Sequence, residues 1–168
     1  MWSAIQTLLS RVFWLARKFP VPFRRPASCK EDPPNTDLAI VGLLIDEQDR
    51  RLLAGLGSRN QWKVTLADSF ETAHALSVQL RASAVLCDRD MPGREWAEAV
   101  GVLSSSRHRP CVVLLSRVVD DYLWNEVVRH GGYDVLSKPL REDDLVRIIK
   151  LAQAYWHSGA NHSYSVNQ

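Results

Sequence analysis

The stretch VLCDRDMPG, residues 85–93, decides the fold of this chain. It joins an apolar run directly to an acidic residue, Asp88, and then to a Met-Pro-Gly sequence of the kind that forms turns. A short, continuous apolar run is typical of a strand that is covered on both faces. We therefore predict a buried strand over Ala84–Cys87, with Asp88 at its carboxyl end.

The rest of the sequence repeats this arrangement on both sides of that strand. Short apolar runs alternate with segments of helical periodicity, which indicates parallel strands joined by crossover helices. The fold class is therefore α/β, a five-stranded doubly wound parallel sheet with five helices. The predicted strands are Leu38–Ile45, Trp62–Ala67, Ala84–Cys87, Cys111–Leu115 and Tyr133–Leu136, and the predicted helices lie near residues 48–57, 70–81, 94–105, 119–130 and 142–157.

The size and charge of the chain are those of one folded domain with short extensions. It has 168 residues, of which 46% are hydrophobic and 24% are charged, enough for a core without metals or disulfides. Residues 1–36 hold six basic and two acidic residues, whereas residues 37–168 hold 15 basic and 17 acidic ones. The predicted domain therefore lacks the basic surface that is typical of nucleic-acid binding.

The three cysteines stand at unrelated positions. Cys87 and Cys111 each lie beside an apolar run, so we expect them to be small core residues of a protein in a reducing compartment. No group of cysteines and histidines has the spacing of a zinc site.

The sequence divides into four segments. We predict a basic amphipathic helix over residues 1–19, a proline-rich linker over 20–36, the folded domain over 37–157 and a disordered tail over 158–168. The apolar side chains between Trp2 and Phe19 fall on one arc of the first helix. Arg11 interrupts the apolar run along the sequence too early for a membrane span, and charges inside that run do not suit a signal peptide.

Three interpretations of residues 2–19 stay open. The segment would lie on an anionic membrane surface, which the basic residues around it favour. Alternatively, it would dock on a partner protein or on the folded domain itself. The third interpretation is an extension without a function of its own.

Polar residues stand where four of the predicted strands end. Because the carboxyl ends of parallel strands meet at one edge of a sheet, we expect these side chains to lie close together. Crowded carboxylates need a counter-charge, and a hard divalent cation with oxygen ligands supplies one. The set predicts phosphoryl transfer, with an acceptor oxygen, Mg²⁺ and a lysine. Its members are Asp46 and Glu47 after the first strand, Asp88 after the third, Ser116 after the fourth and Lys138-Pro139 after the fifth.

In these motifs the sequence resembles the receiver domains of two-component response regulators over residues 38–156. The matching stretches are LLIDE at 43–47, VLCDRDMPG at 85–93, VVLLS at 112–116 and GGYDVLSKP at 131–139. Each one ends its own predicted strand, so the resemblance is more specific than a single Asp-x-x-Met-Pro motif. It implies a stand-alone, flavodoxin-like receiver with the strand order 2-1-3-4-5.

The resemblance also implies a role for each residue of the site. Asp88 would accept a phosphoryl group from a histidine kinase or a phosphotransfer protein. Ser116 would bind a phosphoryl oxygen, and Lys138 would pair with the phosphoryl group, with a cis peptide bond before Pro139. Apart from phosphorylating and dephosphorylating itself with Mg²⁺, such a domain would not be an enzyme. The implied Mg²⁺ ligands are Asp46, Glu47, Asp88 and the backbone carbonyl of Asp90.

Several positions depart from the family pattern. The acid pair is Asp-Glu rather than Asp-Asp, and Asp49 would substitute for one of the two if the register shifted. Arg117 follows Ser116, where the family usually has a small residue. Val135 stands where the family commonly has an aromatic switch residue. Tyr133 lies on the same face of the strand but two residues away from that position.

Other functions therefore stay open. A degenerate receiver, a binding module that no longer takes phosphate, is favoured by Arg117 and Val135. A small phosphatase with an aspartate nucleophile would also use Asp88-x-Asp90, although the further acidic motif of that class is missing. Asp46 and Glu47 would equally suit a solvated helix start.

The expected partners are a histidine kinase or phosphotransfer protein and an unidentified output protein, but no nucleic acid. Residues 2–19 are a candidate contact with a membrane or a partner, so we expect a cytoplasmic location, or a peripheral one at the inner membrane. The helix near 119–130 carries more apolar side chains than one buried face needs, which makes it a candidate partner or homodimer surface. The side chains in question are Val118, Val119, Tyr122, Trp124, Val127 and Val128.

Overall fold

The computed structural model describes residues 38–159, with side chains up to residue 155. This part of the chain alternates five strands with five helices. The strands are β1 (Ala39–Leu43), β2 (Lys63–Ala67), β3 (Ala84–Asp88), β4 (Cys111–Ser116) and β5 (Asp134–Ser137), and the helices are α2 (Glu47–Asn60), α3 (Phe70–Gln79), α4 (Trp96–Ser104), α5 (Asp121–Arg129) and α6 (Glu142–Gly159).

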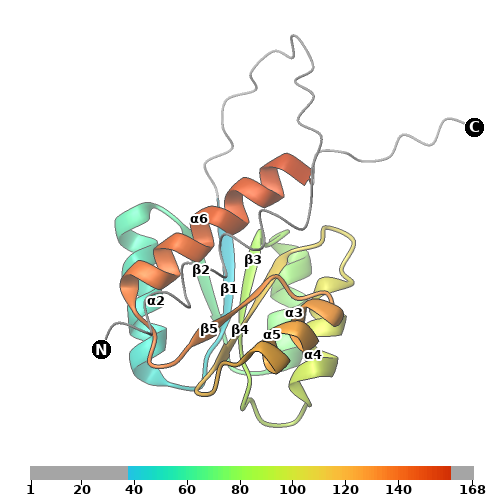
Figure 1. Ribbon diagram of the computed structural model, residues 1–168. Helices are drawn as coiled ribbons and strands as arrows, with labels where there is room; N and C mark the ends of the chain where they lie inside the picture. Colours follow the sequence, from blue (N-terminus) through green and yellow to red (C-terminus); the bar gives the residue numbers. More distant parts are fainter. Residues whose placement is uncertain (1–37, 160–168) are drawn as a thin grey trace, which may run out of the picture. The chain divides into compact units, whose positions relative to one another are not determined.

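The strands form one parallel sheet with the order β2-β1-β3-β4-β5 (Figure 1). The order reverses between β1 and β3, and in open sheets of this kind a crevice forms there, outside the carboxyl ends of the strands. Leu43 pairs with Cys87 in the ladder between β1 and β3. The next residues along the chain, Leu44 and Asp88, therefore reach this edge of the sheet side by side.

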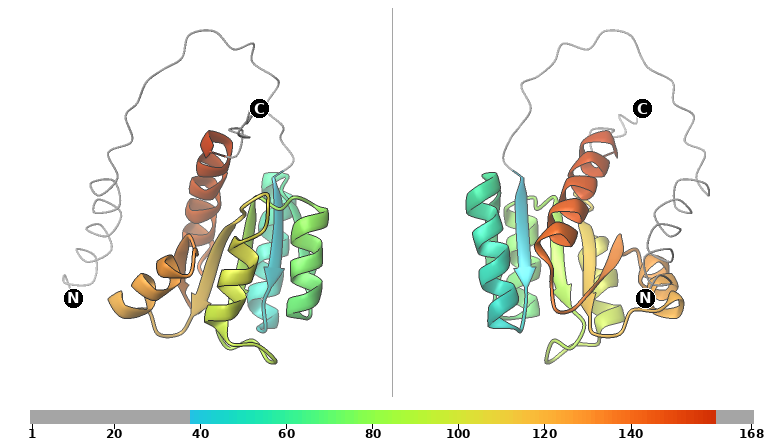
Figure 2. Two further views of the ribbon diagram at one scale, coloured as in Figure 1. Left: turned by 90° about the vertical axis from the view of Figure 1, so that its right-hand side faces the viewer. Right: turned by 60° about the vertical axis from the view of Figure 1, so that its left-hand side comes forward.

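Helices cover both faces of the sheet (Figure 1, Figure 2). On one face α2 and α6 pack over a core that includes Ile40, Leu53 and Ile148. On the other face α3, α4 and α5 pack over a core that includes Val85 and Leu103. Burial on both faces explains why the strands are continuous apolar runs rather than alternating ones.

The ends of the helices are set by local side-chain and backbone chemistry. Asp46 caps α2 by accepting a hydrogen bond from the backbone N–H of Gln48 at 2.8 Å. Asp120 caps α5 in the same way, by accepting from the N–H of Leu123 at 2.7 Å. These carboxylates satisfy N–H groups that have no partner within the helix. After α5 the chain turns at Gly131, whose φ of 87° favours glycine.

The predicted sheet, its strand order and its five helices are confirmed. One boundary differs in a way that affects the site: the predicted first strand reaches Ile45, whereas β1 ends at Leu43. Leu44 is buried outside the strand, and Ile45 is 52% exposed. Apolar composition alone does not mark where strand pairing stops, because the same run continues into the turn before α2.

The predicted helix over residues 1–19 and the linker over 20–36 lie outside the described residues, as do residues 160–168 of the predicted tail. Helix α6 extends to Gly159. Among the helices between residues 38 and 159, none combines the length and the apolar composition that a membrane crossing requires.

Candidate functional site

Asp88 lies at the carboxyl edge of the sheet, where the strand order reverses. Pairing with Leu115 of β4 fixes its backbone, and its side chain is only 1% exposed. Its Oδ2 atom accepts hydrogen bonds from the backbone N–H of Ile45 at 3.4 Å and from Lys138 Nζ at 2.5 Å. A buried carboxylate is stable only with such partners. One comes from the segment after β1, which pairs with β3, and the other from the segment after β5, which pairs with β4.

Lys138 follows β5 and brings a positive charge to Asp88. Its backbone N–H donates to the carbonyl of Ser116 at 2.9 Å, and the peptide bond to Pro139 is cis, as predicted. Burial lowers the pKa of Lys138, but the hydrogen bond and the charge of Asp88, with a further contribution from Asp49, outweigh burial and leave this pKa raised. The side chain is therefore a charged ammonium at neutral pH.

Asp49 brings a second carboxylate to Lys138, from the buried face of α2. It is 4% exposed and shares that face with Leu53. Its Oδ1 atom accepts from the N–H of Leu140 at 3.3 Å, and its Oδ2 atom lies 3.2 Å from Lys138 Nζ, an ion pair without hydrogen-bond geometry. One ammonium thus faces two carboxylates in a buried group that we call the Asp49–Lys138–Asp88 cluster.

Asp46 and Glu47, the predicted acid pair, serve the first turn of α2 instead. Both are exposed. Asp46 caps the helix, and Glu47 forms ion pairs with Arg51 at 3.0 Å and with Arg50 at 3.8 Å. Acids are favourable at a helix N-terminus because they compensate its partial positive charge. These contacts match a solvated helix start.

No ready site for the predicted divalent cation is found among the described residues around Asp88. Mg²⁺ requires oxygen ligands in near-octahedral geometry, usually including one or two carboxylates that are free to bind it. The residues that leave β1 beside Asp88 are Leu44 and Ile45, which offer no side-chain oxygen, and both nearby carboxylates are paired with Lys138. Between residues 38 and 155, no three His, Cys, Asp or Glu side chains are grouped to hold a metal ion. The predicted ligand set of Asp46, Glu47, Asp88 and the carbonyl of Asp90 stays a prediction.

Ser116 lies at the predicted edge of the sheet, at the end of β4, and is buried. Its hydroxyl donates to the carbonyl of Val118 at 2.7 Å and accepts from the N–H of the same residue at 3.2 Å. The hydroxyl thus stabilises its own turn. Arg117, the departure noted in the sequence, is exposed.

The position of the aromatic switch is occupied by the buried side chain of Val135. Tyr133 lies elsewhere, with its ring 5.5 Å from that of Tyr155 on α6, and burial is the main reason that its pKa is raised to about 12. Trp124 of α5 donates from Nε1 to Asp134 of β5 at 3.0 Å. This hydrogen bond, rather than an aromatic switch, joins α5 to β5.

Cys87 and Cys111 are buried free thiols, as expected for core residues. Burial raises the pKa of each thiol to about 12, with an added effect of the neighbouring Asp88 charge on Cys87. Both are therefore protonated at neutral pH and poor nucleophiles.

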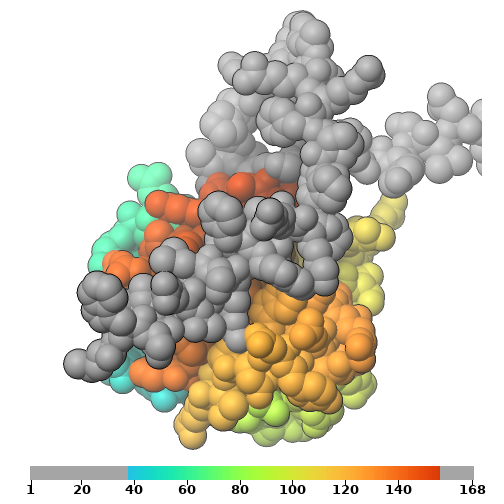
Figure 3. Space-filling view, viewed as in Figure 1, coloured from blue at the N-terminus to red at the C-terminus, as the bar shows by residue number. Residues whose placement is uncertain are grey.

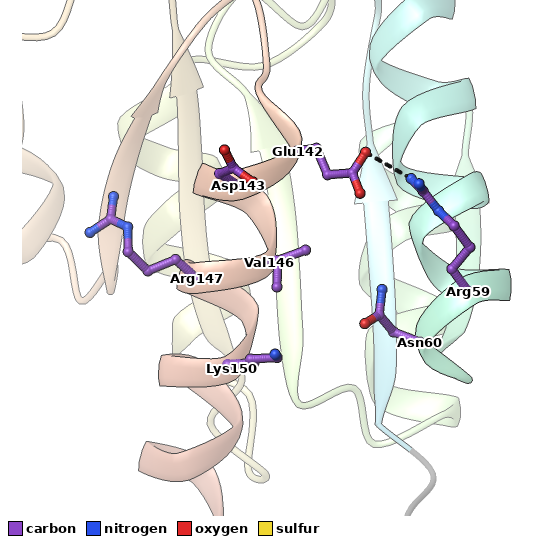
Figure 4. A pocket seen from close by; sticks show the side chains of 7 residues that line it. All are labelled: Arg59, Asn60, Glu142, Asp143, Val146, Arg147 and Lys150. Carbon is purple, nitrogen blue, oxygen red and sulfur yellow. Dashed lines mark hydrogen bonds and ion pairs between the residues drawn. The ribbon is translucent and has the colours of Figure 1, made fainter.

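Two of the hollows on the surface of the described residues are of notable size, and neither is lined by the Asp49–Lys138–Asp88 cluster. One, of about 530 Å³, lies between the end of α2 and the start of α6, where Arg59 pairs with Glu142 at 2.9 Å (Figure 4). The other, of about 440 Å³, lies in the loop before α4 beside Asp90 and Trp96. Their linings are mainly charged, so they do not resemble apolar ligand pockets.

Helix α5 and the loop before it carry exposed apolar side chains on the surface that Figure 3 shows in orange. Tyr122 is 75% exposed and Val118 is 62% exposed, and Val128 is also exposed. The predicted surface over 119–130 is thus partly outward-facing and partly core. The remaining members pack in or against the core: Val119, Trp124 and Val127.

Two curated relatives are similar to this chain over its folded part. The regulatory protein AtoC of Escherichia coli (strain K12) is 27% identical over 112 residues, and the 3',5'-cyclic-nucleotide phosphodiesterase regA of Dictyostelium discoideum is 26% identical over 125 residues. The alignments cover 66% and 71% of this chain but only 24% and 16% of the two relatives. The chain therefore spans about a quarter or less of the length of these relatives.

Solved structures share the fold. A two-component response regulator from Clostridium difficile has a TM-score of 0.64 at 16% identity, covering 70% of this chain and 97% of its own. The Vibrio cholerae chemotaxis protein CheY4 has a TM-score of 0.63 at 16% identity, covering 69% and 98%. NtrX from Brucella abortus, in complex with ATP, has a TM-score of 0.66 at 20% identity, covering 74% of this chain and 29% of its own.

The profile of the response regulator receiver domain family matches residues 43–150, which is most of the chain. This match agrees with the strand order, the cis peptide bond before Pro139 and the contact between Lys138 and Asp88. The chain belongs to the response regulator receiver domain family, the domains that act in two-component signal transduction.

Proposed function

We propose that this chain is a receiver module that signals through protein–protein contacts without Mg²⁺-dependent phosphoryl transfer to Asp88. A receiver is a signalling domain rather than a catalytic enzyme, and it implies a histidine kinase partner in general. The observation that carries the proposal is the Asp49–Lys138–Asp88 cluster, in which the acceptor carboxylate is buried and paired inside the protein.

Phosphoryl transfer to a carboxylate depends on two conditions. The attacking oxygen must be free to line up with the phosphorus, and cations must neutralise the charge on the transferred group. Asp88 is 1% exposed with Oδ2 already bonded, and Leu44 and Ile45 provide no carboxylate beside it. The residues present support neither condition. We therefore propose that signalling depends on the contacts that the folded domain makes with other proteins.

Phosphorylation of Asp88 is the second candidate, and one observation favours it. Asp88, Ser116 and Lys138 all lie at the carboxyl edge of the sheet, with Lys138 in contact with Asp88. In this alternative a histidine kinase or phosphotransfer protein would phosphorylate Asp88, and Ser116 would give up its bonds to Val118 to reach the phosphoryl group. An aspartate-nucleophile phosphatase has less support, because Asp90 is exposed and no group of three acids that could hold a metal ion is found among the described residues.

Labelling with acetyl phosphate separates the two candidates. We expect the intact mass of the full chain, incubated with acetyl phosphate and Mg²⁺, to stay unchanged. A gain of one phosphoryl group that disappears in Asp88→Asn would overturn the proposal. A receiver with an intact acid pair, treated in parallel, checks that the reagent is active.

We also propose that the exposed part of α5 and its preceding loop is a contact surface for a partner or a second copy. Val118 and Tyr122 are large apolar side chains that remain mostly exposed, so they are available for a contact. The buried neighbours Leu123 and Val127 hold the helix in place, so substitutions at Tyr122 leave the core intact.

For residues 2–19 we propose contact with an anionic membrane surface, on the sequence pattern alone. Co-sedimentation of the full chain with vesicles that contain anionic lipid tests this. We expect binding that falls when Leu8→Asp interrupts the apolar arc and when salt is raised. Equal binding to neutral vesicles, or none to either, would rule out the membrane and leave a protein contact.

A further inference from the structure

The two edges of the sheet differ in charge. Because the sheet is parallel, every helix-to-strand turn lies at the edge where the strands begin, and every strand-to-helix loop lies at the edge that holds Asp88 (Figure 2). The strand-to-helix loops contain five acidic and five basic residues, so their charges balance. The four helix-to-strand turns contain basic residues and no acidic one. These turns are residues 61–62, 80–83, 105–110 and 130–133.

Four exposed cations stand at the edge where the strands begin, and we call them the basic edge. They are Lys63 at the start of β2, Arg81 in the turn before β3, and Arg107 and Arg109 in the turn before β4. Between residues 38 and 155, none of the four takes part in an ion pair. The basic edge therefore presents positive charge that the described residues do not neutralise.

The turns before β3 and β4 lie next to each other. The N–H of Ser83 donates to the carbonyl of Ala39 at 2.8 Å, and the N–H of Cys111 donates to the carbonyl of Ser83 at 2.9 Å. Burial is the main reason that the pKa of His108 is lowered, and the positive charges of Arg81 and His74 lower it further. The positive charges of the two turns therefore act on the same region of the surface.

Two of these arginines occupy backbone positions that favour glycine. Arg81 has a φ of 48° and Arg109 a φ of 47°, both in the left-handed region. Arg81 follows the end of α3, where the N–H of Ala82 donates to the carbonyl of Ser77 at 2.9 Å. Glycine adopts this conformation at the end of a helix with the least strain. The backbone of these turns therefore gives no reason for an arginine at either position.

The chain enters the sheet at the basic edge. The N–H of Lys63 donates to the carbonyl of Leu38, directly before β1, at 2.9 Å. The residues before Leu38 contain six basic and two acidic residues within 1–36, and the apolar residues between Trp2 and Phe19 follow helical spacing. The basic edge is thus continuous along the chain with the segment for which we propose contact with an anionic membrane.

The shape of the basic edge also favours a membrane over a nucleic acid. Proteins that read a duplex usually insert a helix or a pair of strands into a groove, and those that bind single strands stack bases on aromatic side chains. The basic edge consists of short turns between helices and strands. A membrane with anionic lipids is a broad negative surface, and exposed lysines and arginines are enough to bind it.

We propose that the basic edge is a contact surface for anionic lipid, so that the folded domain lies on the membrane with the amino ends of its strands and directs the Asp88 edge away from it. The inference goes beyond the proposed function, because it assigns a binding surface to the folded domain itself. The Asp88 edge and the exposed side chains on and beside α5 then stay accessible to partner proteins.

Co-sedimentation of the full chain with vesicles of phosphatidylcholine and phosphatidylserine tests the inference. The basic-edge variant combines Arg81→Gln, Arg107→Gln and Arg109→Gln, which remove charge from exposed side chains. We expect it to bind at least about tenfold more weakly than wild type, since each basic residue close to an anionic surface strengthens binding several-fold. Binding of wild type should weaken as salt is raised and be absent with phosphatidylcholine alone.

A matched control separates the place of the charges from their number. The control variant combines Arg51→Gln, Arg117→Gln and Arg141→Gln, three exposed arginines towards the Asp88 edge, and has the same net charge as the basic-edge variant. It should bind nearly as well as wild type. Hydrogen exchange of wild type with anionic vesicles should show protection in residues 105–109 and none in residues 117–120.

Four results would overturn the inference: no binding of wild type to the anionic vesicles, binding of the basic-edge variant equal to that of wild type, equal losses in the two variants, or binding to DNA instead of the vesicles. Failure of the proposal for residues 2–19 is a separate outcome, in which Leu8→Asp binds as wild type while the basic-edge variant does not. Labelling by acetyl phosphate reports on Asp88 alone, so it tests the proposed function independently.

Discussion

At the scale of single residues, the Asp49–Lys138–Asp88 cluster holds two carboxylates and one ammonium. This balance predicts which substitutions lower the free energy of unfolding most. Lys138→Met leaves two buried carboxylates without a cation, which should lower the free energy of unfolding by about 3–5 kcal/mol. Asp49→Asn keeps the ammonium paired with Asp88 and keeps an oxygen for Leu140, so it should cost at most about 1.5 kcal/mol. Urea denaturation at neutral pH measures both.

A double variant tests whether the effect arises from this cluster. Lys138→Met combined with Asp49→Asn should be more stable than Lys138→Met alone, since one of the two unpaired charges is gone. Asp46→Asn is the exposed control and should change stability little, because asparagine also caps helices well. Equal losses for Lys138→Met and Asp49→Asn would contradict the charge count.

The lowered pKa of His108 predicts that the folded protein loses stability in acid. Burial lowers its pKa, and the positive charges of Arg81 and His74 lower it further. Because the unfolded chain takes up this proton at a higher pH than the folded chain, stability should fall as the pH drops below about 6.5 and level off below the folded pKa. His108→Gln should reduce this slope in unfolding experiments between pH 7 and pH 5. An unchanged slope would contradict the account.

At the scale of elements, two glycines of α2 predict opposite effects of the same substitution. A Cβ at Gly55 would meet nothing within 4 Å, so Gly55→Ala should stabilise the protein by up to about 1 kcal/mol through helix propensity. A Cβ at Gly57 would lie 2.5 Å from Val64 Cγ2 and 3.3 Å from the carbonyl of Trp62, so Gly57→Ala should destabilise it. Thermal unfolding of both variants checks the packing of α2 on β2, and a gain for Gly57→Ala would contradict it.

The elements could be predicted from the sequence because the strands are short, continuous apolar runs and the segments between them have helical periodicity. The exception was the end of β1. The run from Leu38 to Ile45 is uniformly apolar, so nothing in its composition separates the paired residues from Leu44 and Ile45. The composition therefore did not show that strand pairing stops at Leu43. Asp49 carried a detectable signal, since it precedes Leu53 and Leu56 at helical spacing on the buried face.

At the scale of the whole molecule, the sequence predicted the sheet, its order and the approach of Lys138 to Asp88, because strand ends in a parallel sheet share one edge. It did not predict which acids would turn inward. Which acids are buried depends on the register between β1 and β3 and on the direction of the first turn of α2. A sequence motif specifies neither of these.

The exposed apolar side chains on and beside α5 predict an effect on association. Tyr122→Lys should weaken self-association or partner binding of the full chain while its thermal unfolding stays close to wild type, because Tyr122 is 75% exposed. Sedimentation velocity over a range of concentrations measures self-association. Val78→Lys, on α3, is a control at another exposed apolar residue and should leave association unchanged. Association that responds to Val78 and not to Tyr122 would place the contact elsewhere.

The central claim is that Lys138, and not a metal ion with a phosphoryl group, is the partner of Asp88. Its most direct test is a titration of the full chain with beryllofluoride and Mg²⁺, followed through the backbone amide signals of residues 88, 116 and 138. The account predicts spectra that do not change and that match those of Asp88→Asn treated in the same way. New signals at these three residues, absent from Asp88→Asn, would contradict it.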